Sequence, residues 1–329
     1  MKKLLRSIPF IVSCYHVAVG IISNFVPGIA NKRGTGGTNT ARYCYSVWMR
    51  HLCNLSKFGM EHIPQTIAEL GPGDSLGIGL SAMLSGADQY YALDIVEHAN
   101  NERNLVIFEE LLTMFKKRES IPDDNEFPEV KPVLENYSFP SHILTDSLLE
   151  QTLNEERINK IRNCLKQLHT NIIVDFDVYV GYIVPWVNYN GKFPNSGLIF
   201  SQACLEHVDM LEEAYHVMNK ALLPNGFMSH DIDFKSHGVT IKWNGHWAYS
   251  DMKWNMIRGK RPYLINREPL ATHLMMGEKN GFEVLTVVRT TQNDGISLNK
   301  LKKRFGSITK EDFTTSSAFV IMQKNKPTE

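Results

Sequence analysis

Two short runs of the chain carry carboxylate and imidazole side chains that could move a proton or hold a metal ion. Glu206 and His207 are adjacent in the first run. The second run mixes the same two chemistries: His230, Asp231, Asp233 and His237. A histidine beside a carboxylate can take a proton from a hydroxyl, because the carboxylate orients the ring and stabilises its charged form. As metal ligands, these groups suit Mn²⁺ or Zn²⁺ better than Mg²⁺.

Both runs also have simpler interpretations. His207 could cap a helix or pack below a ligand, and the 230–237 run could be solvated loop. If 227–234 is a strand, alternation places Asp231 and Asp233 on one face and His230 on the other.

A glycine turn indicates a second kind of chemistry, the binding of a nucleotide. Gly71 and Gly73 lie in the run ELGPGDS, and Asp94 follows 21 residues after Gly73. Glycines allow a ligand to approach the backbone closely, and a carboxylate at the end of the next strand can accept both hydroxyl hydrogens of a ribose. This arrangement suits either a dinucleotide or S-adenosylmethionine.

Two residues favour S-adenosylmethionine over the dinucleotide. Leu76 stands where the dinucleotide fingerprint requires its third glycine. Glu69, two residues before the first glycine, would repel a pyrophosphate and suit the positively charged methionine end of S-adenosylmethionine.

Hydrophobic periodicity predicts the elements that must position these residues. Strands are expected at 66–70, 89–93, 172–174, 197–201, 227–234, 282–288 and 318–323. Helices are expected near 41–58, 76–84, 102–118, 146–169, 209–222 and 269–279. A strand, a glycine turn, a helix and a second strand form the first half of a doubly wound α/β domain, in which ligands bind at the carboxyl ends of the strands.

Three runs together resemble the class I S-adenosylmethionine-dependent methyltransferases, in particular the small-molecule, methyltransferase type 11-like branch. The runs are IAELGPGDSLGIG, YALDIV and LIFSQACLEHVDMLEEAYHVMNKALLPNGF. The resemblance covers about residues 64–100 and 172–290. It implies a Rossmann-like, doubly wound α/β sheet of the class I methyltransferase type.

The resemblance also implies roles for particular residues. The candidate cofactor-binding residues are Glu69, Gly71, Pro72, Gly73, Asp74, Asp94, Ser201 and Gln202. Glu69 and the glycines would contact the amino-acid part, Asp94 the ribose, and Ser201 and Gln202 the methionine part. The acid that contacts adenine in this family has no counterpart in residues 183–196.

At the reacting end, the candidate catalytic residues are His207, His230 and His246, with His237 as a secondary candidate base. Some related O-methyltransferases bind a divalent metal through a Glu-x-x-Glu-His motif. This chain keeps Glu206 and His207 but has Ala203 in place of the first glutamate. The tentative metal ligands are therefore Glu206, His207 and His246.

The predicted domains are an N-terminal helical extension at 1–60 and a methyltransferase domain at 61–329, with inserts at about 100–170 and 235–267. The first insert is expected to be a cap or a substrate-side element. The second contains Trp243, Trp247, Trp254, Arg258, Lys260, Arg261 and Arg267. These residues favour an anionic or saccharide acceptor. The alternative is that the tryptophans form the insert's own core and the cations are solvated.

The N-terminal segment has three interpretations. Lys2, Lys3 and Arg6 precede a mostly apolar stretch at 8–30. It could be a helix on the domain's own core, a peripheral membrane helix, or a cleaved signal.

Composition narrows the class of protein. The 329 residues are 43% hydrophobic with a net charge of zero, which excludes disorder and weighs against nucleic acid as a partner. Five cysteines without a CxxC motif indicate a reducing compartment. A cytoplasmic protein is expected, with peripheral contact at the inner membrane face as an option.

The sequence therefore predicts an S-adenosylmethionine-dependent methyltransferase that methylates oxygen on a small-molecule or glycan acceptor, with a divalent metal as a further cofactor. The alternatives are N- or C-methylation, a non-catalytic S-adenosylmethionine-binding scaffold, and an NAD-dependent enzyme.

Overall fold

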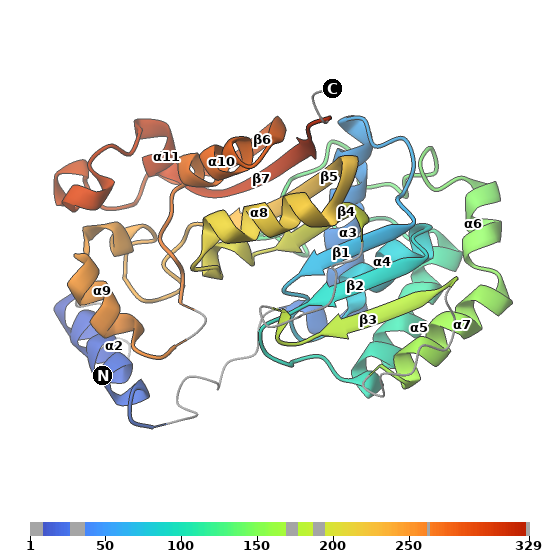
Figure 1. The fold of residues 1–329 in the computed structure, drawn as a ribbon, viewed down its shortest axis with the longest axis horizontal. Coiled ribbons are helices and arrows are strands. Elements are labelled where there is room, and N and C mark those ends of the chain that lie inside the picture. The colour runs from blue at the N-terminus through green and yellow to red at the C-terminus, as the bar shows by residue number, and fades with distance from the viewer. Residues whose placement is uncertain (1–8, 27–36, 169–176, 187–194, 262–263, 327–329) are drawn as a thin grey trace.

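A computed structural model describes residues 9–26, 37–168, 177–186, 195–261 and 264–326 of the chain (Figure 1). Its centre is a seven-stranded sheet in the order β3-β2-β1-β4-β5-β7-β6. The strands are β1 (Thr66–Leu70), β2 (Gln89–Leu93), β3 (Tyr179–Ile183), β4 (Ser196–Gln202), β5 (Leu222–Asp233), β6 (Phe282–Thr291) and β7 (Thr315–Lys324). Strands β1 to β5 pair in parallel, and β7 runs antiparallel between β5 and β6. This topology confirms the predicted Rossmann-like sheet of the class I methyltransferase type.

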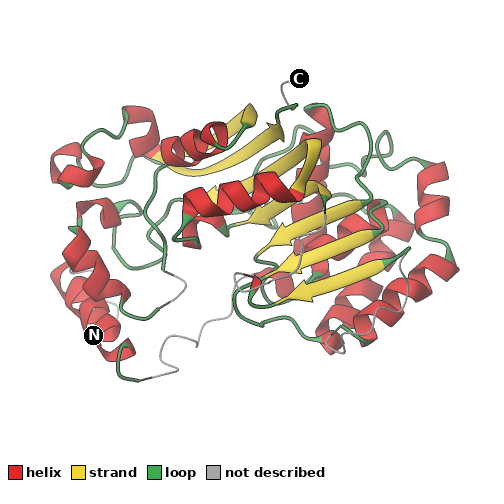
Figure 2. Cartoon of the chain, viewed as in Figure 1, coloured by secondary structure: helices red, strands yellow, loops and turns green. Residues whose placement is uncertain are grey.

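Helices cover both faces of the sheet, as Figure 2 shows. They are α2 (Pro9–Ser23), α3 (Ala41–Lys57), α4 (Gly77–Ser85), α5 (Asn101–Lys117), α6 (Asp146–Thr152), α7 (Glu155–Lys166), α8 (Leu211–Ala221), α9 (Asp251–Arg258), α10 (Leu270–Lys279) and α11 (Lys310–Thr314). Helices α3, α4, α5 and α7 share one hydrophobic cluster with the sheet, and α8 and α10 share another on the opposite face. None of the helices in the described ranges combines the length and hydropathy that crossing a membrane requires.

Strand alternation assigns the two faces of β1. Ile67 belongs to the cluster under α3 and α4, whereas Ala68 and Leu70 belong to the cluster under α8. Successive side chains of a strand point to opposite faces, so Glu69 lies on the α4 side with Ile67. This placement decides what the Glu69 carboxylate can reach.

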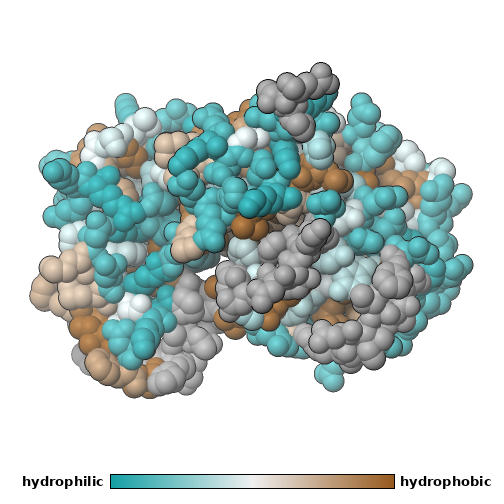
Figure 3. Space-filling view, in the orientation of Figure 1, coloured by the Kyte–Doolittle hydropathy of each residue, from teal (hydrophilic) through white to brown (hydrophobic). Residues whose placement is uncertain are grey.

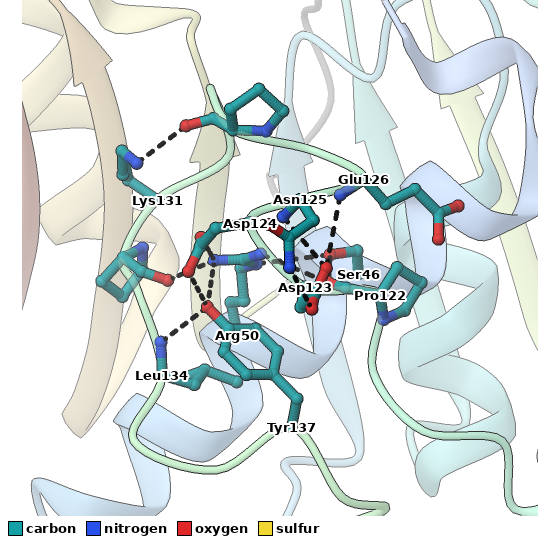
Figure 4. A network of polar contacts seen from close by, with 12 residues as sticks. Ser46, Arg50, Pro122, Asp123, Asp124, Asn125, Glu126, Lys131, Leu134 and Tyr137 are labelled. Carbon is teal, nitrogen blue, oxygen red and sulfur yellow. Dashed lines mark hydrogen bonds and ion pairs between the residues drawn. The ribbon is translucent and has the colours of Figure 1, made fainter.

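The segment after α5 is tied to the main core through a buried arginine of α3 (Figure 4). Arg50 is fully buried and donates to the Asp124 carboxylate at 3.1 Å and to the Pro132 carbonyl at 2.8 Å. Tyr137 donates to the same carboxylate at 2.6 Å and its ring lies 5.1 Å from the guanidinium carbon. Helices α5 and α7 also lie in the main cluster. The described part of this segment, residues 100–168, thus extends the core layer.

Some element predictions hold closely and others do not. The predicted bounds of β1 and β2 match the structure, and the two predicted strands near the C-terminus are longer than expected. The helix expected at 146–169 is two helices, α6 and α7. Strand β3 was not predicted, and the strand expected at 172–174 lies outside the described residues.

The second insert has its own small cores. Trp254 packs with Val239 and Ile257, while Trp243 and Trp247 pack with Phe305. All three tryptophans are at most 9% exposed, so the structure favours the interpretation in which they form the insert's core over stacking on a sugar.

Two of the insert's cations are also engaged within the protein. The buried Arg267 pairs with Asp251, and Arg258 pairs with Asp209. These two arginines are therefore neutralised by carboxylates of the same chain.

Candidate cofactor and acceptor site

The glycine turn lies at the carboxyl end of β1, beside the end of β2. Gly71 and Gly73 have φ of +67° and +76°, a left-handed conformation that favours glycine. A Cβ on Gly71 would lie 2.7 Å from the Cys204 sulfur, so this glycine is also required by close packing. The Gly71 amide donates to the Leu93 carbonyl at 2.8 Å, which fixes the turn against the strand that carries Asp94.

Asp94 sits where a ribose acid is expected. Its carboxylate accepts from the Ile95 amide at 2.7 Å and the Val96 amide at 3.4 Å. Burial raises the pKa of Asp94, and these amides, with that of Gly73, partly offset the shift. The turn and Asp94 therefore form one unit at the carboxyl edge of the sheet.

A short segment ahead of α3 holds the glycine turn from outside, and sequence reasoning missed it. The Thr38 hydroxyl oxygen accepts from the amides of Asp74 at 2.8 Å and Ser75 at 3.3 Å. The Ser75 hydroxyl in return donates to the Thr38 carbonyl. A hydroxyl that satisfies two consecutive amides fixes the turn's shape. We call this contact the Thr38 clasp.

Glu69 lies beneath the turn in the protein interior. It is 1% exposed and accepts a short hydrogen bond from the Tyr90 hydroxyl. Burial raises the pKa of Glu69 to about 8, and the bonds from Tyr90 and the Gly79 amide oppose the shift. The observed partners of this carboxylate are thus groups of α4 and β2, and its contact with a cofactor stays a prediction.

Gln202 and Asp231 meet at the carboxyl ends of β4 and β5. The Gln202 amide donates to one Asp231 carboxylate oxygen at 2.7 Å, while the other oxygen is buried without a partner. Burial, followed by the charge of Asp233, raises the pKa of Asp231 to about 7. Burial also raises the pKa of Tyr43 on α3, with the charge of Asp231 as a further cause.

Ser201 and His230 face the opposite side of the sheet, as strand alternation predicts. The His230 ring is 1% exposed and its Nδ1 lies 2.8 Å from the Ser201 hydroxyl. Burial lowers the pKa of His230 to about 3, so the ring is neutral near pH 7. The potential metal-ligand group of Glu206, His207 and His237 does not include His230, and the Ser201 hydroxyl is engaged by the His230 ring.

Three potential metal ligands converge after β4 and β5. One ligand atom from each of Glu206, His207 and His237 lies within 4.8 Å of the others. The His207 and His237 rings are 5.1 Å apart between centroids, and His207 Nε2 lies 4.0 Å from a Glu206 carboxylate oxygen. Asp233 orients His237, with 3.4 Å between its carboxylate and Nε2. We call Glu206, His207 and His237 the carboxylate–histidine cluster.

The second insert holds the backbone of this cluster in place. The Asn266 amide donates to the Glu206 carbonyl at 2.6 Å. Its side-chain amide donates to the carbonyls of Leu205 at 2.9 Å and Val208 at 2.8 Å. Asn266 therefore fixes the short 3-10 turn at Leu205–His207.

The cluster differs from the predicted ligand set in its third residue. His246 is 1% exposed and its ring lies 4.9 Å from that of Trp247, within the insert core. Burial lowers the pKa of His246 to about 3. His237, considered from sequence only as a base, takes the place expected for His246. Spacing along the chain could not reveal this, because the loop after β5 brings His237 back toward β4.

The Glu206 side chain fits a cation. It is 2% exposed and neither carboxylate oxygen has a hydrogen-bond partner of normal geometry. Burial raises the pKa of Glu206 well above its usual range, and the nearby amides of Glu206 and Asp233 offset only part of the shift. A buried carboxylate without a partner carries a large free-energy penalty, which a bound divalent ion would remove.

Comparisons with known proteins find similarity in fold only. No family model matches the chain, and no curated protein matches it. An S-adenosylmethionine-dependent methyltransferase from Mesorhizobium loti aligns with 84% of this chain and 98% of its own, at 10% identity and a TM-score of 0.41. Phosphoethanolamine N-methyltransferase 2 from Haemonchus contortus, solved with S-adenosyl-L-methionine, aligns with 88% of this chain and 57% of its own, at 14% identity and a TM-score of 0.41. At these values the similarity carries no argument about function.

Proposed function

We propose that this protein is an S-adenosylmethionine-dependent methyltransferase. The observation that carries the proposal is the left-handed Gly71–Gly73 turn joined to Asp94 at the carboxyl edge of a class I methyltransferase-type sheet. The glycines of the turn would let the methionine end approach the backbone closely, and Asp94 offers a carboxylate to the ribose hydroxyls.

We propose oxygen on a small molecule as the acceptor atom. In this reaction the acceptor oxygen attacks the sulfonium methyl carbon and the carbon–sulfur bond breaks. The products are S-adenosylhomocysteine and the methyl ether or ester, and one proton is released to a base. A neutral hydroxyl needs such a base or a Lewis acid, whereas an amine needs less assistance. The carboxylate–histidine cluster supplies either form of assistance.

The cluster residues would hold a divalent ion of the Mn²⁺ or Zn²⁺ type, with Glu206, His207 and His237 as ligands. When bound, such an ion lowers the pKa of a coordinated hydroxyl. Asp233 would hold the His237 ring in orientation, because its carboxylate lies at the ring's Nε2. We do not propose a glycan acceptor, because the tryptophans that suggested one are buried.

Calorimetric titration with S-adenosylmethionine, S-adenosylhomocysteine and NAD tests the cofactor. We expect binding of the first two only, and roughly hundredfold weaker binding by Asp94→Ala, the scale of losing charge-assisted hydrogen bonds. Asp88→Ala is the matched control: it removes a carboxylate at the other end of the same strand, where Asp88 pairs with Arg157. Binding of NAD alone, or equal losses in both variants, would refute the assignment.

The alternatives separate in a second experiment. Methyl transfer to amine or carbon acceptors with none to hydroxyls would favour N- or C-methylation. Tight cofactor binding without turnover across all acceptor classes would favour a non-catalytic scaffold.

A further inference from the structure

Helix α2 is oriented opposite to an ordinary surface helix. Its buried residues are polar or small: Ser13, His16, Gly20 and Ser23. Its exposed residues, with those directly after it, are mostly apolar: Phe10, Cys14, Tyr15, Ala18, Ile21, Ile22, Phe25 and Val26. The helix contains no Asp, Glu, Lys or Arg residue. A surface helix normally faces its apolar stripe toward the core, so this arrangement leaves the hydrophobic surface for another partner.

Backbone contacts fix α2 in this orientation against α9. A Cβ on Gly20 would lie 2.1 Å from the Met256 carbonyl oxygen, and one on Gly259 would lie 2.0 Å from the Gly20 carbonyl oxygen. The Ser23 hydroxyl oxygen accepts from the Lys260 amide at 3.1 Å. These contacts require small residues on the inner side of α2, so the helix cannot rotate its apolar side inward.

The exposed apolar surface continues onto α9. Met252 is 73% exposed and Met256 is 40% exposed, while Phe10 and Phe25 near the ends of α2 are 76% and 80% exposed. Figure 3 shows brown and tan side chains gathered over α2 at the lower left, where the neighbouring surface is mostly teal. We define the outward face as Phe10, Ile21, Ile22, Phe25, Val26, Met252 and Met256.

Basic residues adjoin the outward face. Lys260 is exposed where α9 meets α2, and Lys253 on α9 lies 4.0 Å from the ring centre of Tyr249. Large apolar side chains beside lysines are typical of a surface that lies in the interface of an anionic membrane.

We propose that the outward face docks on an anionic lipid bilayer, with α2 lying in the plane of the interface. Charge favours this occupant over a second copy of the chain, because the cations beside the face would repel one another across a symmetric contact. His16 Nε2 pairs with the Gly238 carbonyl at 3.1 Å, one residue from His237. His16 lies on the inner side of α2, so the loop that carries His237 would lie behind the docked helix and not at its outward face.

Sedimentation of the full chain with vesicles tests the surface without any need for activity. We expect binding to phosphatidylcholine vesicles that contain phosphatidylglycerol, and much weaker binding to phosphatidylcholine alone. Phe25→Glu combined with Met252→Glu should weaken binding roughly a hundredfold, about tenfold for each large apolar side chain withdrawn from the interface. Lys260→Glu should weaken binding to the anionic vesicles alone, by about fivefold or more.

Val106→Glu is the matched control, because Val106 is an exposed apolar residue on α5, far from α2 in Figure 1. Its binding should equal that of the wild type, and unchanged cofactor titrations verify folding. If the double variant does not fold, Phe10→Ser provides a milder change on the same face. The proposal is overturned if the wild type ignores anionic vesicles, if Val106→Glu loses as much binding, or if the chain is a dimer that the double variant dissociates.

Discussion

The proposed site has a cofactor half, formed by the glycine turn, Glu69 and Asp94, and an acceptor half, formed by Glu206, Asp231 and their neighbours. The two halves differ in whether their buried polar groups have hydrogen-bond partners inside the protein. In the proposed cofactor half, the protein itself supplies partners: amides donate to Asp94, Tyr90 donates to Glu69, and Thr38 accepts from the turn. In the proposed acceptor half, both oxygens of Glu206 and one oxygen of Asp231 are buried without a hydrogen bond of normal geometry. A native protein rarely leaves such groups unpaired. The polar groups of the glycine turn, Glu69 and Asp94 are therefore satisfied within the protein, whereas Glu206 and Asp231 retain oxygens that are available to a ligand.

The largest expected effect is on the acceptor half, where a metal ion would bind the carboxylate–histidine cluster. Mn²⁺ at a hundred times its dissociation constant should stabilise the wild type by about 2.7 kcal/mol in a thermal or urea unfolding experiment. Glu206→Gln and His237→Gln should lose this response, because each removes a ligand of the cluster. His246→Gln should keep it, because His246 lies in the insert core.

Glu212→Gln is the control for lost charge, since Glu212 is an exposed acid paired with Lys279. A stabilisation that survives Glu206→Gln, or that disappears in His246→Gln alone, would show that the ion binds elsewhere.

A smaller effect is expected in the cofactor half, when the glycine turn is altered. Gly71→Ala places a Cβ against the Cys204 sulfur and also strains a left-handed residue, so we expect a loss of about 2 kcal/mol in cofactor binding, roughly thirtyfold. Gly59→Ala carries the strain without the collision, because φ there is +101° and nothing lies within 4 Å of the added atom. It should cost about 1 kcal/mol of folding stability and leave cofactor affinity unchanged. Equal affinities for the two variants would contradict the role of the turn.

The Thr38 clasp allows a milder test. Thr38→Val keeps the shape of the side chain but leaves the Asp74 and Ser75 amides without their acceptor, at about 1 kcal/mol. We expect cofactor affinity to fall about five- to tenfold in the same titration. Thr40→Val is the matched control, because the Thr40 side chain makes no capping bond to α3. If Thr38 contributes packing alone, both variants should bind the cofactor with wild-type affinity.

A further test concerns pH and a histidine that is fully buried in the main core. Burial lowers the pKa of His51 to about 4, while its Nδ1 lies 2.7 Å from the Ser229 hydroxyl. The unfolded chain protonates His51 near pH 6.5 and the folded chain does not, so stability falls as pH decreases from about 6.5 toward 4.

His51→Gln should remove up to about 1.4 kcal/mol per pH unit of this dependence, measured by urea unfolding at pH 7.5 and 5.5. His62→Gln, at an exposed position, should leave the slope unchanged. An unchanged slope in His51→Gln would mean that this ring is already charged in the folded protein.

The sequence predicted best where a local pattern determines structure. The bounds of β1 and β2 follow from short apolar runs that end in a glycine turn or an acid. Strand β3 escaped prediction because it is an edge strand, only partly buried, with Gly181 in its middle. Glycine weakens a strand pattern, and an edge strand needs less apolar character.

The acceptor half was harder to predict because its geometry depends on loops. The Glu206–His207 pair was visible as neighbours in sequence, but the third member of the cluster depends on how the chain folds back after β5. The tryptophans that suggested a ligand surface are core residues. Their burial depends on packing between α9 and segments distant in sequence, so a local pattern could not predict it. The orientation of α2 likewise follows from backbone contacts at Gly20, which hydrophobicity alone does not reveal.

The exposed side of α2 also makes the wild-type chain suitable for spectroscopy. Of the five free cysteines, Cys14 is the exposed one, and it lies on that side. Burial raises the pKa of Cys53 to about 11 and those of Cys44 and Cys204 further, so these thiols remain protonated and unreactive near neutral pH. A maleimide dye sensitive to polarity would therefore label α2 without any substitution. Its emission would report directly whether this helix leaves water.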